Sequence, residues 1–391
     1  MHILKLEGQV ALGDDNIVEP GQYLTEDVLG AQLLVMGGGG TMEPLREKRV
    51  PIFGDKFGAD GALMIDTGNG SQGLSPCTSL LFGRTGGLGD LTLLTPVLRE
   101  IKRRWPTVRI AVASIKELQQ SIQNLPFIDE LLQYPVSVEK ANTYDGWIWL
   151  ENAIEKNPDA KEMHSVDVVA KFIGLDLPED CDKLQAYAVT DQERSWVQWA
   201  YPRINGIRRI CIQTQASARC RTYPMNKTKE IVRDLLQKNW EVFLLGAPGE
   251  VKEPDKPIAG LRIVADGATF RQRAALVESS DCFLGPDSSL THVAGALKIP
   301  AVALYGPFPW QVRTLYAKTT RALTRKEGFP CAPCSFHATL NQSFPKNCPT
   351  AEKGFCGVLE AITPKQIVDA IEEITPKLET GNVEAFPGGK A

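Results

Sequence analysis

The chain has 391 residues, 43% of them hydrophobic, and a formal net charge of −4. This length and composition predict two or three domains with proper cores and exclude a mainly disordered protein. The charge provides no overall field that would attract nucleic acid, so a general nucleic-acid-binding protein is not expected.

Residues 1–75 are predicted to form a small appended module. Within it, "VEPGQYLTEDVLGAQLLVMGGGG" predicts a turn, a short helix and a flexible run of four glycines, Gly37–Gly40, which offers no anion site because no helix start follows it. The chain does not begin with a signal peptide, and it has no uninterrupted apolar run long enough to span a membrane. With nine cysteines, several in apolar segments, this indicates a cytoplasmic protein in a reducing compartment, with membrane association at most peripheral.

From about residue 78, strands and helices alternate, which is typical of a doubly wound parallel sheet. The first unit has predicted strands at residues 79–84, 108–114 and 144–151, and predicted helices at residues 91–106, 115–126, 165–175 (ended by Gly174) and 191–204. The second unit has predicted strands at residues 208–214, 241–247, 261–266, 281–285 and 301–307, and helices at residues 226–240, 269–280 and 289–299. Two such units predict a cleft between them, with ligands beyond the carboxyl ends of the strands.

The stretch "LFGRTGGLGD" joins the first strand of this pattern to its first helix. Its glycines, Gly83, Gly86, Gly87 and Gly89, have neither the dinucleotide-binding nor the Walker spacing. The carboxylate of Asp90 would repel a phosphate, but it suits a helix cap or a base directed into the cleft. Considered alone, this loop favours the cap.

A second candidate site is "GPDSSLTHVAGALKIPAVALYGP", where Asp287, Ser288 and Ser289 lie between a predicted strand and a predicted helix. Hydroxyls and free amides at such a helix start suit a diphosphate, and His292 lies one turn further on. A capped helix with a core histidine is the alternative. The chain has only four histidines, and this one lies beside a polar helix start, which favours the ligand site.

Three smaller groups of residues allow two interpretations each. Arg219 and Arg221, after the first strand of the second unit, either supply positive charge to a nucleotide diphosphate or form a solvated pair. Glu250, at the end of "LLGAPGE", is a weak candidate for binding ribose hydroxyls. Arg99 and Lys102, near the end of the first helix, either complement the helix dipole or hold an acidic acceptor.

Four cysteines follow the second unit with the spacing C-x2-C-x13-C-x7-C: Cys331, Cys334, Cys348 and Cys356. The first pair has the spacing of a zinc knuckle, whereas the second pair is split by seven residues. Structural zinc and reduced, packed thiols both remain open. A catalytic zinc is not expected, because the loop offers no base.

Taken together, these motifs resemble glycosyltransferase family 9, the ADP-heptose:lipopolysaccharide heptosyltransferases. The resemblance covers about residues 78–325 and the closing helix, and it is carried in order by "GGLGDLTLLTPVLREIKRRWP", "ASARCRTYP", "LLGAPGE" and "PDSSLTHVAGALKIPAVALYGP". It implies an α/β protein of the GT-B fold, with two facing Rossmann-like, doubly wound parallel-sheet domains. The expected divisions are an N-terminal module (1–75), an acceptor-side domain (76–203), a nucleotide-sugar domain (204–325), a cysteine-containing loop (326–362) and a C-terminal helix and tail (363–391).

The resemblance implies an inverting, metal-independent transfer of a sugar from a nucleotide diphosphate donor to a saccharide hydroxyl, without a cofactor. Asp90 would be the general base. Arg221 would occupy the position of the family's basic residue on the diphosphate, helped by Arg219. The other residues that the resemblance assigns to the donor are Gly246, Glu250, Asp287, Ser288, Ser289, Leu290 and His292, and those that it assigns to the acceptor side are Gly86, Gly87, Gly89, Arg99 and Lys102.

This sequence departs from the family in three respects: the long N-terminal segment, arginine where those enzymes carry lysine, and the four-cysteine loop. The donor is expected to be heptose-type and ADP-linked, but these departures leave the sugar and the acceptor open. One alternative is transfer to a hydroxylated base in DNA, as in a bacteriophage enzyme. Another is a non-catalytic binding protein that keeps the scaffold. A dehydrogenase is disfavoured, since neither unit has the G-x-G-x-x-G spacing.

Overall fold

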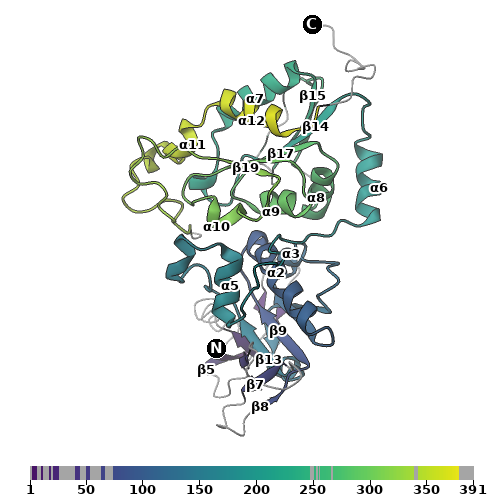
Figure 1. Ribbon diagram of the computed structural model, residues 1–391, viewed down its shortest axis with the longest axis vertical. Coiled ribbons are helices and arrows are strands. Elements are labelled where there is room, and N and C mark those ends of the chain that lie inside the picture. Colours follow the sequence, from purple (N-terminus) through teal and green to yellow (C-terminus); the bar gives the residue numbers. More distant parts are fainter. Residues whose placement is uncertain are drawn as a thin grey trace. The chain divides into compact units, whose positions relative to one another are not determined.

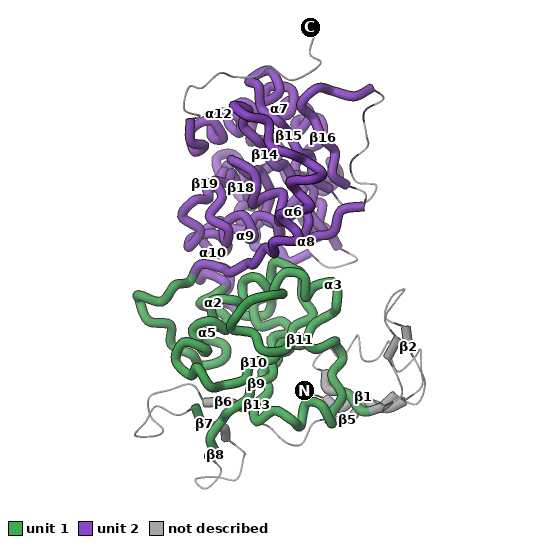
Figure 2. The backbone as a smooth tube through the Cα atoms, turned by 90° about the vertical axis from the view of Figure 1, so that its right-hand side faces the viewer, with its two compact units in different colours: residues 1–157, 166–183 green, residues 158–165, 184–391 purple. Residues whose placement is uncertain are grey.

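The computed structural model describes residues 77–246, 256–265, 267–338 and 342–377, together with Leu63, Val251, Pro254 and short strands before residue 77. The chain divides into two compact units (Figures 1 and 2). Unit 1 contains residues Met1–Asn157 and Val166–Lys183, and unit 2 contains residues Pro158–Ser165 and Leu184–Ala391. Each unit is described by itself.

Unit 1 is built on a parallel sheet with the order β11-β10-β9-β13. Its strands are β9 (Ser79–Gly83), β10 (Arg109–Ser114), β11 (Glu130–Gln133) and β13 (Gly146–Trp149), and its helices include α2 (Leu88–Arg104), α3 (Lys116–Gln119) and α4 (Val138–Ala141). Strand β9 is completely buried. Because β9 pairs with β10 on one side and with β13 on the other, the direction of chain progression reverses at β9. Loops after β9 and β13 therefore meet at one sheet edge, where α/β proteins bind ligands.

The described part of the N-terminal segment is made of short strands. Antiparallel strands β4 (Gly21–Thr25), β1 (His2–Leu6) and β5 (Gly40–Pro44) continue into β12 (Val136–Ser137), which comes from the Rossmann-like part of unit 1. The others are β2 (Val10–Ala11), β3 (Ile17–Val18), β6 (Val50–Ile52), β7 (Met64–Asp66) and β8 (Leu74–Pro76). Gly40, predicted to be flexible, instead begins a strand and pairs with Leu6. Residues 26–39, where the short helix and the first three glycines were predicted, lie outside the described residues.

Unit 2 is built on a six-stranded parallel sheet with the order β16-β15-β14-β17-β18-β19. Its strands are β14 (Arg208–Ile212), β15 (Trp240–Leu245), β16 (Leu261–Val264), β17 (Cys282–Pro286), β18 (Ala301–Leu304) and β19 (Thr320–Leu323). Numbered from the first strand, this order is 3-2-1-4-5-6, the Rossmann order, with its switch point between β14 and β17.

The helices of unit 2 cover both faces of this sheet, so its strands are apolar on both faces. Side chains alternate along β14: Ile210 and Ile212 join the cluster formed with α7 (Met225–Gln237) and α12 (Pro364–Ile374), whereas Cys211 faces the cluster of the opposite helices. The remaining helices are α6 (Asp191–Ala200), α8 (Phe270–Glu278), α9 (Ser289–Ala296), α10 (Gln311–Thr314), α11 (Gly357–Ala361) and the 3-10 turns η2 (Pro158–Lys161), η3 (Arg219–Arg221) and η4 (Ala351–Lys353). Helix α5 (Ser165–Ile173) begins at the division between the units.

Most predicted elements from residue 78 onward are confirmed. Helix α5 gives way to Gly174 with φ +78°, as its glycine predicted. Helix α3 is shorter than predicted, and strands β11, β12 and β19 were missed. The sequences of β11 and β19, "ELLQ" and "TRAL", are only half-buried and short, so neither shows the apolar run of a central strand.

Candidate functional site

The switch point of unit 2 brings two predicted motifs together. The loop after β14 contains Arg221, and the turn after the neighbouring strand β17 contains Asp287. Arg221 Nη1 donates a hydrogen bond to the Asp287 carbonyl at 3.0 Å and lies 3.8 Å from that residue's carboxylate. Its Nη2 donates to Ser217 Oγ at 2.9 Å. Arg221 is therefore fixed at the sheet edge and is not the solvated surface group of the alternative interpretation.

Asp287 is the centre of a compact charged group. It is only 4% exposed, and its carboxylate lies 3.8 Å from His292 Nε2 and 3.7 Å from Arg313 Nε, besides its contact with Arg221. Within the described part of the chain, neither Asp287 Oδ2 nor Arg313 Nε has a hydrogen-bond partner. A buried polar atom is normally hydrogen-bonded. Asp287 Oδ2 can therefore accept, and Arg313 Nε can donate, one further hydrogen bond.

The N-terminus of α9 lies beside this group. Ser288 is the N-cap residue, but its side chain makes no capping hydrogen bond; it is within 3.4 Å of Gln213 Oε1. The backbone N–H groups of Ser289 and Leu290 belong to the first turn, where no earlier helical carbonyl is available. The alternative prediction is a capped helix with a core histidine. The helix is present and His292 is 4% exposed, but the Ser288 side chain makes no capping hydrogen bond.

Gly285 allows the close approach of strand and helix that shapes this corner. A Cβ atom at this position would lie 2.5 Å from the Phe283 ring and 2.8 Å from Thr291 Oγ1. The Thr291 hydroxyl donates to the Pro286 carbonyl at 2.5 Å, which ties the first turn of α9 to the end of β17. Backbone of this kind is what a phosphate requires at a helix start.

Sequence reasoning missed Arg313, which lies on α10. Its side chain is buried, its Nη1 donates to Ser165 Oγ at 2.8 Å, and its guanidinium lies over the Phe308 ring at 4.5 Å from the centroid. These contacts keep its Nε on Asp287. No motif around "PFPWQVR" signals this role, because Ser165 is 148 residues away in the chain.

The other predicted donor residues are less informative. Arg219 is exposed on η3, and Gly246 follows β15, its N–H donating to the Val264 carbonyl at 3.4 Å. Glu250 lies outside the described residues. A role in donor binding stays a prediction for these three residues.

In unit 1, Asp90 lies in the first turn of α2, and its side chain is 27% exposed. Its Oδ2 accepts a hydrogen bond from the Gly87 N–H at 2.9 Å and lies 3.3 Å from Arg84 Nη2. The first contact is the capping interaction that the loop alone suggests. The contact with Arg84 was not predicted from the sequence. It places the buried Arg84 guanidinium beside the partly exposed Asp90 carboxylate.

Arg84 is the centre of a second charged group at the switch point of unit 1. The guanidinium, 3% exposed, donates to Glu155 Oε1 at 2.6 Å and to the Leu150 carbonyl at 2.5 Å. Glu151, beside it, accepts a hydrogen bond from the Thr85 N–H. Burial by itself would lower the pKa of Arg84, but Asp90 and Glu155 outweigh burial and raise that pKa.

The glycines of this loop make room for protein side chains. A Cβ atom on Gly86 would lie 2.9 Å from Arg84 Nε, from Arg84 Nη2 and from Asp90 Oδ2. A Cβ atom on Gly83 would lie 2.6 Å from the Trp149 ring. A Cβ on Gly87 would meet nothing closer than 3.6 Å. Gly86 therefore permits the Arg84–Asp90 contact. Close approach of an acceptor to Gly86, Gly87 or Gly89 stays a prediction.

Arg99 and Lys102 lie further along α2 and already have partners. Arg99 pairs with Asp182 at 3.0 Å, and Lys102 pairs with Asp129 at 2.8 Å and donates to the Val108 carbonyl. The rise along a helix puts both about two turns or more beyond Asp90. These ion pairs stabilise unit 1, and contact with an acceptor stays a prediction.

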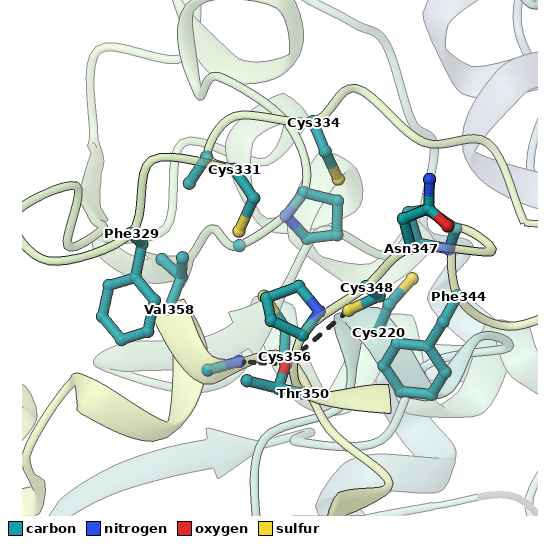
Figure 3. A pocket seen from close by; sticks show the side chains of 16 residues that line it. Cys220, Phe329, Cys331, Cys334, Phe344, Asn347, Cys348, Thr350, Cys356 and Val358 are labelled. Carbon is teal, nitrogen blue, oxygen red and sulfur yellow. Dashed lines mark hydrogen bonds between the residues drawn. The ribbon is translucent and has the colours of Figure 1, made fainter. Parts of the chain in front are cut away.

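The four loop cysteines line one cavity of about 120 Å³, together with Cys220 of η3 (Figure 3). All are free thiols. Burial raises the pKa of Cys220 to about 12 and also raises the pKa of Cys334 and of Cys356, which favours the thiol over the thiolate that binds metals. Among the described residues, no group of three or more His, Cys, Asp or Glu side chains is arranged to hold a metal ion.

None of the described helices is long and apolar enough to cross a membrane.

Comparison with known proteins gives a family match for part of the chain, and a fold. The model of the family described as "Glycosyltransferase family 9 (heptosyltransferase)" matches residues 150–342. Among curated proteins, none matches the chain. The E. coli ADP-heptose lipopolysaccharide heptosyltransferase II has a similar structure, with a TM-score of 0.60, 16% identity, and coverage of 76% of this chain and 98% of its own.

Two further structures agree. A family 9 glycosyltransferase from Veillonella parvula has a TM-score of 0.58 at 16% identity and covers 76% of this chain and 97% of its own. TibC, an iron-containing dodecameric glycosyltransferase from enterotoxigenic E. coli, has a TM-score of 0.57 at 16% identity and covers 80% of this chain and 85% of its own. The predicted family resemblance and the predicted GT-B class of α/β fold are thereby confirmed.

Proposed function

Residues 150–342 match the model of glycosyltransferase family 9, and on this premise we propose that the chain transfers a heptose-type sugar from an ADP-linked donor to a saccharide hydroxyl. The observation that carries the proposal is the charged group at the switch point of unit 2. Arg221 and Arg313 flank one buried carboxylate, Asp287, beside the first turn of α9. Two guanidiniums against one carboxylate leave one positive charge in excess, which suits a diphosphate.

In the proposed complex, the α9 amides of Ser289 and Leu290 and the Ser288 hydroxyl bind the phosphate oxygens. Arg221 adds a charge-assisted hydrogen bond. Asp287 does not bind the phosphates, since two anions repel; it fixes Arg221 and Arg313 in place. These preorganised cations and dipoles stabilise the charge that develops on the leaving nucleoside diphosphate.

The proposed reaction is a single displacement with inversion. The acceptor oxygen attacks the anomeric carbon while the bond from that carbon to the diphosphate oxygen breaks, and the hydroxyl proton passes to Asp90. Arg221 and Arg313 supply the positive charge that a divalent cation supplies in other transferases, so we propose a metal-independent reaction. The nucleoside diphosphate leaves with the bonding electron pair.

The donor proposal draws on two proteins of similar fold that are described with ADP-heptose, TibC and heptosyltransferase II. Heptosyltransferase II is also described as a lipopolysaccharide enzyme, which supports a saccharide acceptor. None of the comparisons points to DNA or to a bacteriophage protein. A non-catalytic binding protein is disfavoured by the presence of Asp90 together with the complete group around Asp287.

We assign the cysteine loop no part in the reaction. TibC contains iron, and Cys331, Cys334, Cys348 and Cys356 offer sulfur ligands for such an ion or for zinc. Their arrangement does not bring three ligands to one point, as noted above for the described residues. We therefore derive no catalytic step from a metal; structural zinc in this loop stays a prediction that metal analysis of the purified protein tests.

A thermal-shift panel tests the function. We expect ADP and ADP-heptose to raise the melting temperature more than the UDP or GDP counterparts, because selective binding stabilises the fold by mass action. Arg221→Gln should lose this shift. Arg203→Gln is the matched control, since Arg203 is half-exposed and pairs with Asp281 before β17, at the opposite end of the strand. Equal shifts in Arg221→Gln, or no shift with any nucleotide, would overturn the proposal.

A further inference from the structure

Arg84 belongs to no donor or acceptor group so far assigned, yet it contacts the proposed base. Its Nη2 lies 3.3 Å from Asp90 Oδ2, the same oxygen that accepts the Gly87 N–H. The guanidinium is almost completely buried and Asp90 is not, so the cation is fixed and the carboxylate has access to solvent. We infer that Arg84 is the positioning residue of Asp90, orienting its carboxylate and keeping it ionised, and that Glu155 moderates this effect by sharing the guanidinium. The inference rests on the proposed role of Asp90 as the base.

Arg84 and Asp90 are held by different elements of unit 1. Its backbone N–H donates to the Ala113 carbonyl at 3.0 Å, and its Nη1 donates to the Leu150 carbonyl. These two contacts tie Arg84 to the ends of β10 and β13, the strands on either side of β9. The cation is thus held by the sheet, whereas Asp90 is carried by the first turn of α2.

Gly86 is the second observation that supports this role. A side chain at position 86 would collide with the Arg84 guanidinium and with Asp90 Oδ2, each 2.9 Å from the added Cβ. The loop therefore leaves space for this pair in particular.

The charged groups that face the Arg84–Asp90 pair determine how strongly the Arg84 charge acts on Asp90. Among the described residues these are Glu155 and Glu151, both from the loop after β13. Glu155 is the nearer partner of Arg84, at 2.6 Å against 3.3 Å for Asp90. The positive charge that Asp90 experiences is consequently reduced by Glu155, and neutralising Glu155 should increase it.

If the charge of Arg84 did not act on Asp90, replacing Arg84 would lower the amount of folded protein without changing how Asp90 titrates. The deciding measurement is therefore the carboxyl carbon-13 titration of the full chain labelled at aspartate, with the Asp90 signal identified by its loss in Asp90→Asn. In Arg84→Gln we expect the titration midpoint of that signal to rise by about one pH unit or more, because an opposite charge within 4–6 Å favours the ionised form. Arg84→Lys should keep the midpoint close to that of the parent.

Glu155→Gln should shift the Asp90 titration midpoint in the opposite direction, to lower pH, and it leaves the buried Arg84 guanidinium in place. This variant keeps the inference testable if Arg84→Gln does not fold. Arg109→Gln is the control: Arg109 also belongs to unit 1 and faces a carboxylate, Glu130, at 3.8 Å, but it is remote from this group. It should leave the midpoint unchanged. Unchanged midpoints in both Arg84→Gln and Glu155→Gln would overturn the inference.

Activity separates this inference from the proposed function. With ADP release from ADP-heptose as the assay, Arg84→Gln should lower kcat at least tenfold, move the acid limb of the pH profile to higher pH, and leave ADP binding by calorimetry unchanged. If Asp90→Asn keeps full activity, the base assignment fails whatever Arg84 does. If Asp90→Asn is inactive and Arg84→Gln keeps the parent's kcat and pH profile, only the inference about Arg84 fails.

Discussion

Arg313 Nε lies 3.7 Å from Asp287 Oδ2, and neither atom has a hydrogen-bond partner within the described residues. The pair is close enough for strong attraction but too long for a hydrogen bond. A small movement of Arg313 would satisfy both atoms or direct the guanidinium to a ligand.

Replacing Arg313 with glutamine should weaken donor binding. A hydrogen bond to a charged group contributes about 1.5–3 kcal/mol, so we expect the Kd for ADP to rise by roughly tenfold to a hundredfold. Arg313→Lys should restore only part of the affinity, because lysine lacks the planar fork. Isothermal titration calorimetry measures both, with Arg203→Gln as the control. An unchanged Kd in Arg313→Gln would show that Arg313 serves only the fold of unit 2.

Asp90→Asn should lower kcat by about 10²–10⁴-fold, the contribution typical of a positioned general base. The Kd for ADP should stay the same, because the donor residues belong to unit 2. The capping interaction gives a useful control, since asparagine can still accept from the Gly87 N–H and α2 should remain intact. Transfer kinetics with ADP-heptose, run beside circular dichroism, test this. Loss of helix together with activity would point to a structural cause.

Transfer should continue in excess EDTA. Charge on the leaving diphosphate is offset in the proposal by Arg221, Arg313 and the start of α9, so no divalent cation is needed. The rate with EDTA should equal the rate with Mg²⁺ within error. A rate that falls with EDTA and returns with one particular metal would contradict the metal-independent proposal.

Gly83→Ala should destabilise unit 1 by about 1–3 kcal/mol, the usual cost of overpacking a core. The added methyl group would lie 2.6 Å from the Trp149 ring, and both residues are buried. Trp149→Phe in the same chain should recover part of the loss, because the smaller ring occupies less of the space that the methyl group needs. Chemical denaturation of the two single variants and the double variant gives the coupling energy. If the losses of stability in the two single variants add up in the double variant, the loop accommodates the methyl group without contact between it and the ring of Trp149.

Glu100 predicts a pH dependence of stability. Hydrogen bonding by Arg103 lowers the pKa of Glu100 to about 2 against the opposing effect of burial, and Arg104 adds to it. A carboxyl whose pKa is lower in the folded state stabilises the fold above its unfolded pKa and loses that contribution as pH falls through the folded value. The melting temperature should therefore fall between about pH 4.5 and pH 2. Glu100→Gln should flatten this acid limb; an unchanged limb would assign it to other carboxylates.

Sequence reasoning located the residues whose position follows from a local pattern. Arg221, Ser288 and His292 lie just after strands or in the first turn of a helix, positions that the alternation of strands and helices predicts. Arg221 meets Asp287 because β14 and β17 are neighbours in the sheet. The sequence could predict alternating strands and helices but not this order.

Arg84 and Arg313 were missed for one physical reason. Each acts through partners far along the chain, Glu155 for the first and Ser165 for the second, and no spacing within a motif reports such a contact. The N-terminal strands were missed because they are two to five residues long and lack clear alternation. The family resemblance assigns Gly86 to the acceptor side, and in the structure the missing side chain at Gly86 makes room for the Arg84–Asp90 pair, as that at Gly83 does for Trp149.

The pairing of β4 with β12 has a consequence for how the chain is made. Strand β4 leaves the ribosome long before its partner, since the whole of β9, α2 and β10 is synthesised between them. The N-terminal sheet must therefore wait, one strand short, until the middle of unit 1 has been translated, and closing so long a loop slows folding. Strand β13 and most of helix α5, which also belong to unit 1, are synthesised later still, so the N-terminal sheet can be completed before the parallel sheet of unit 1.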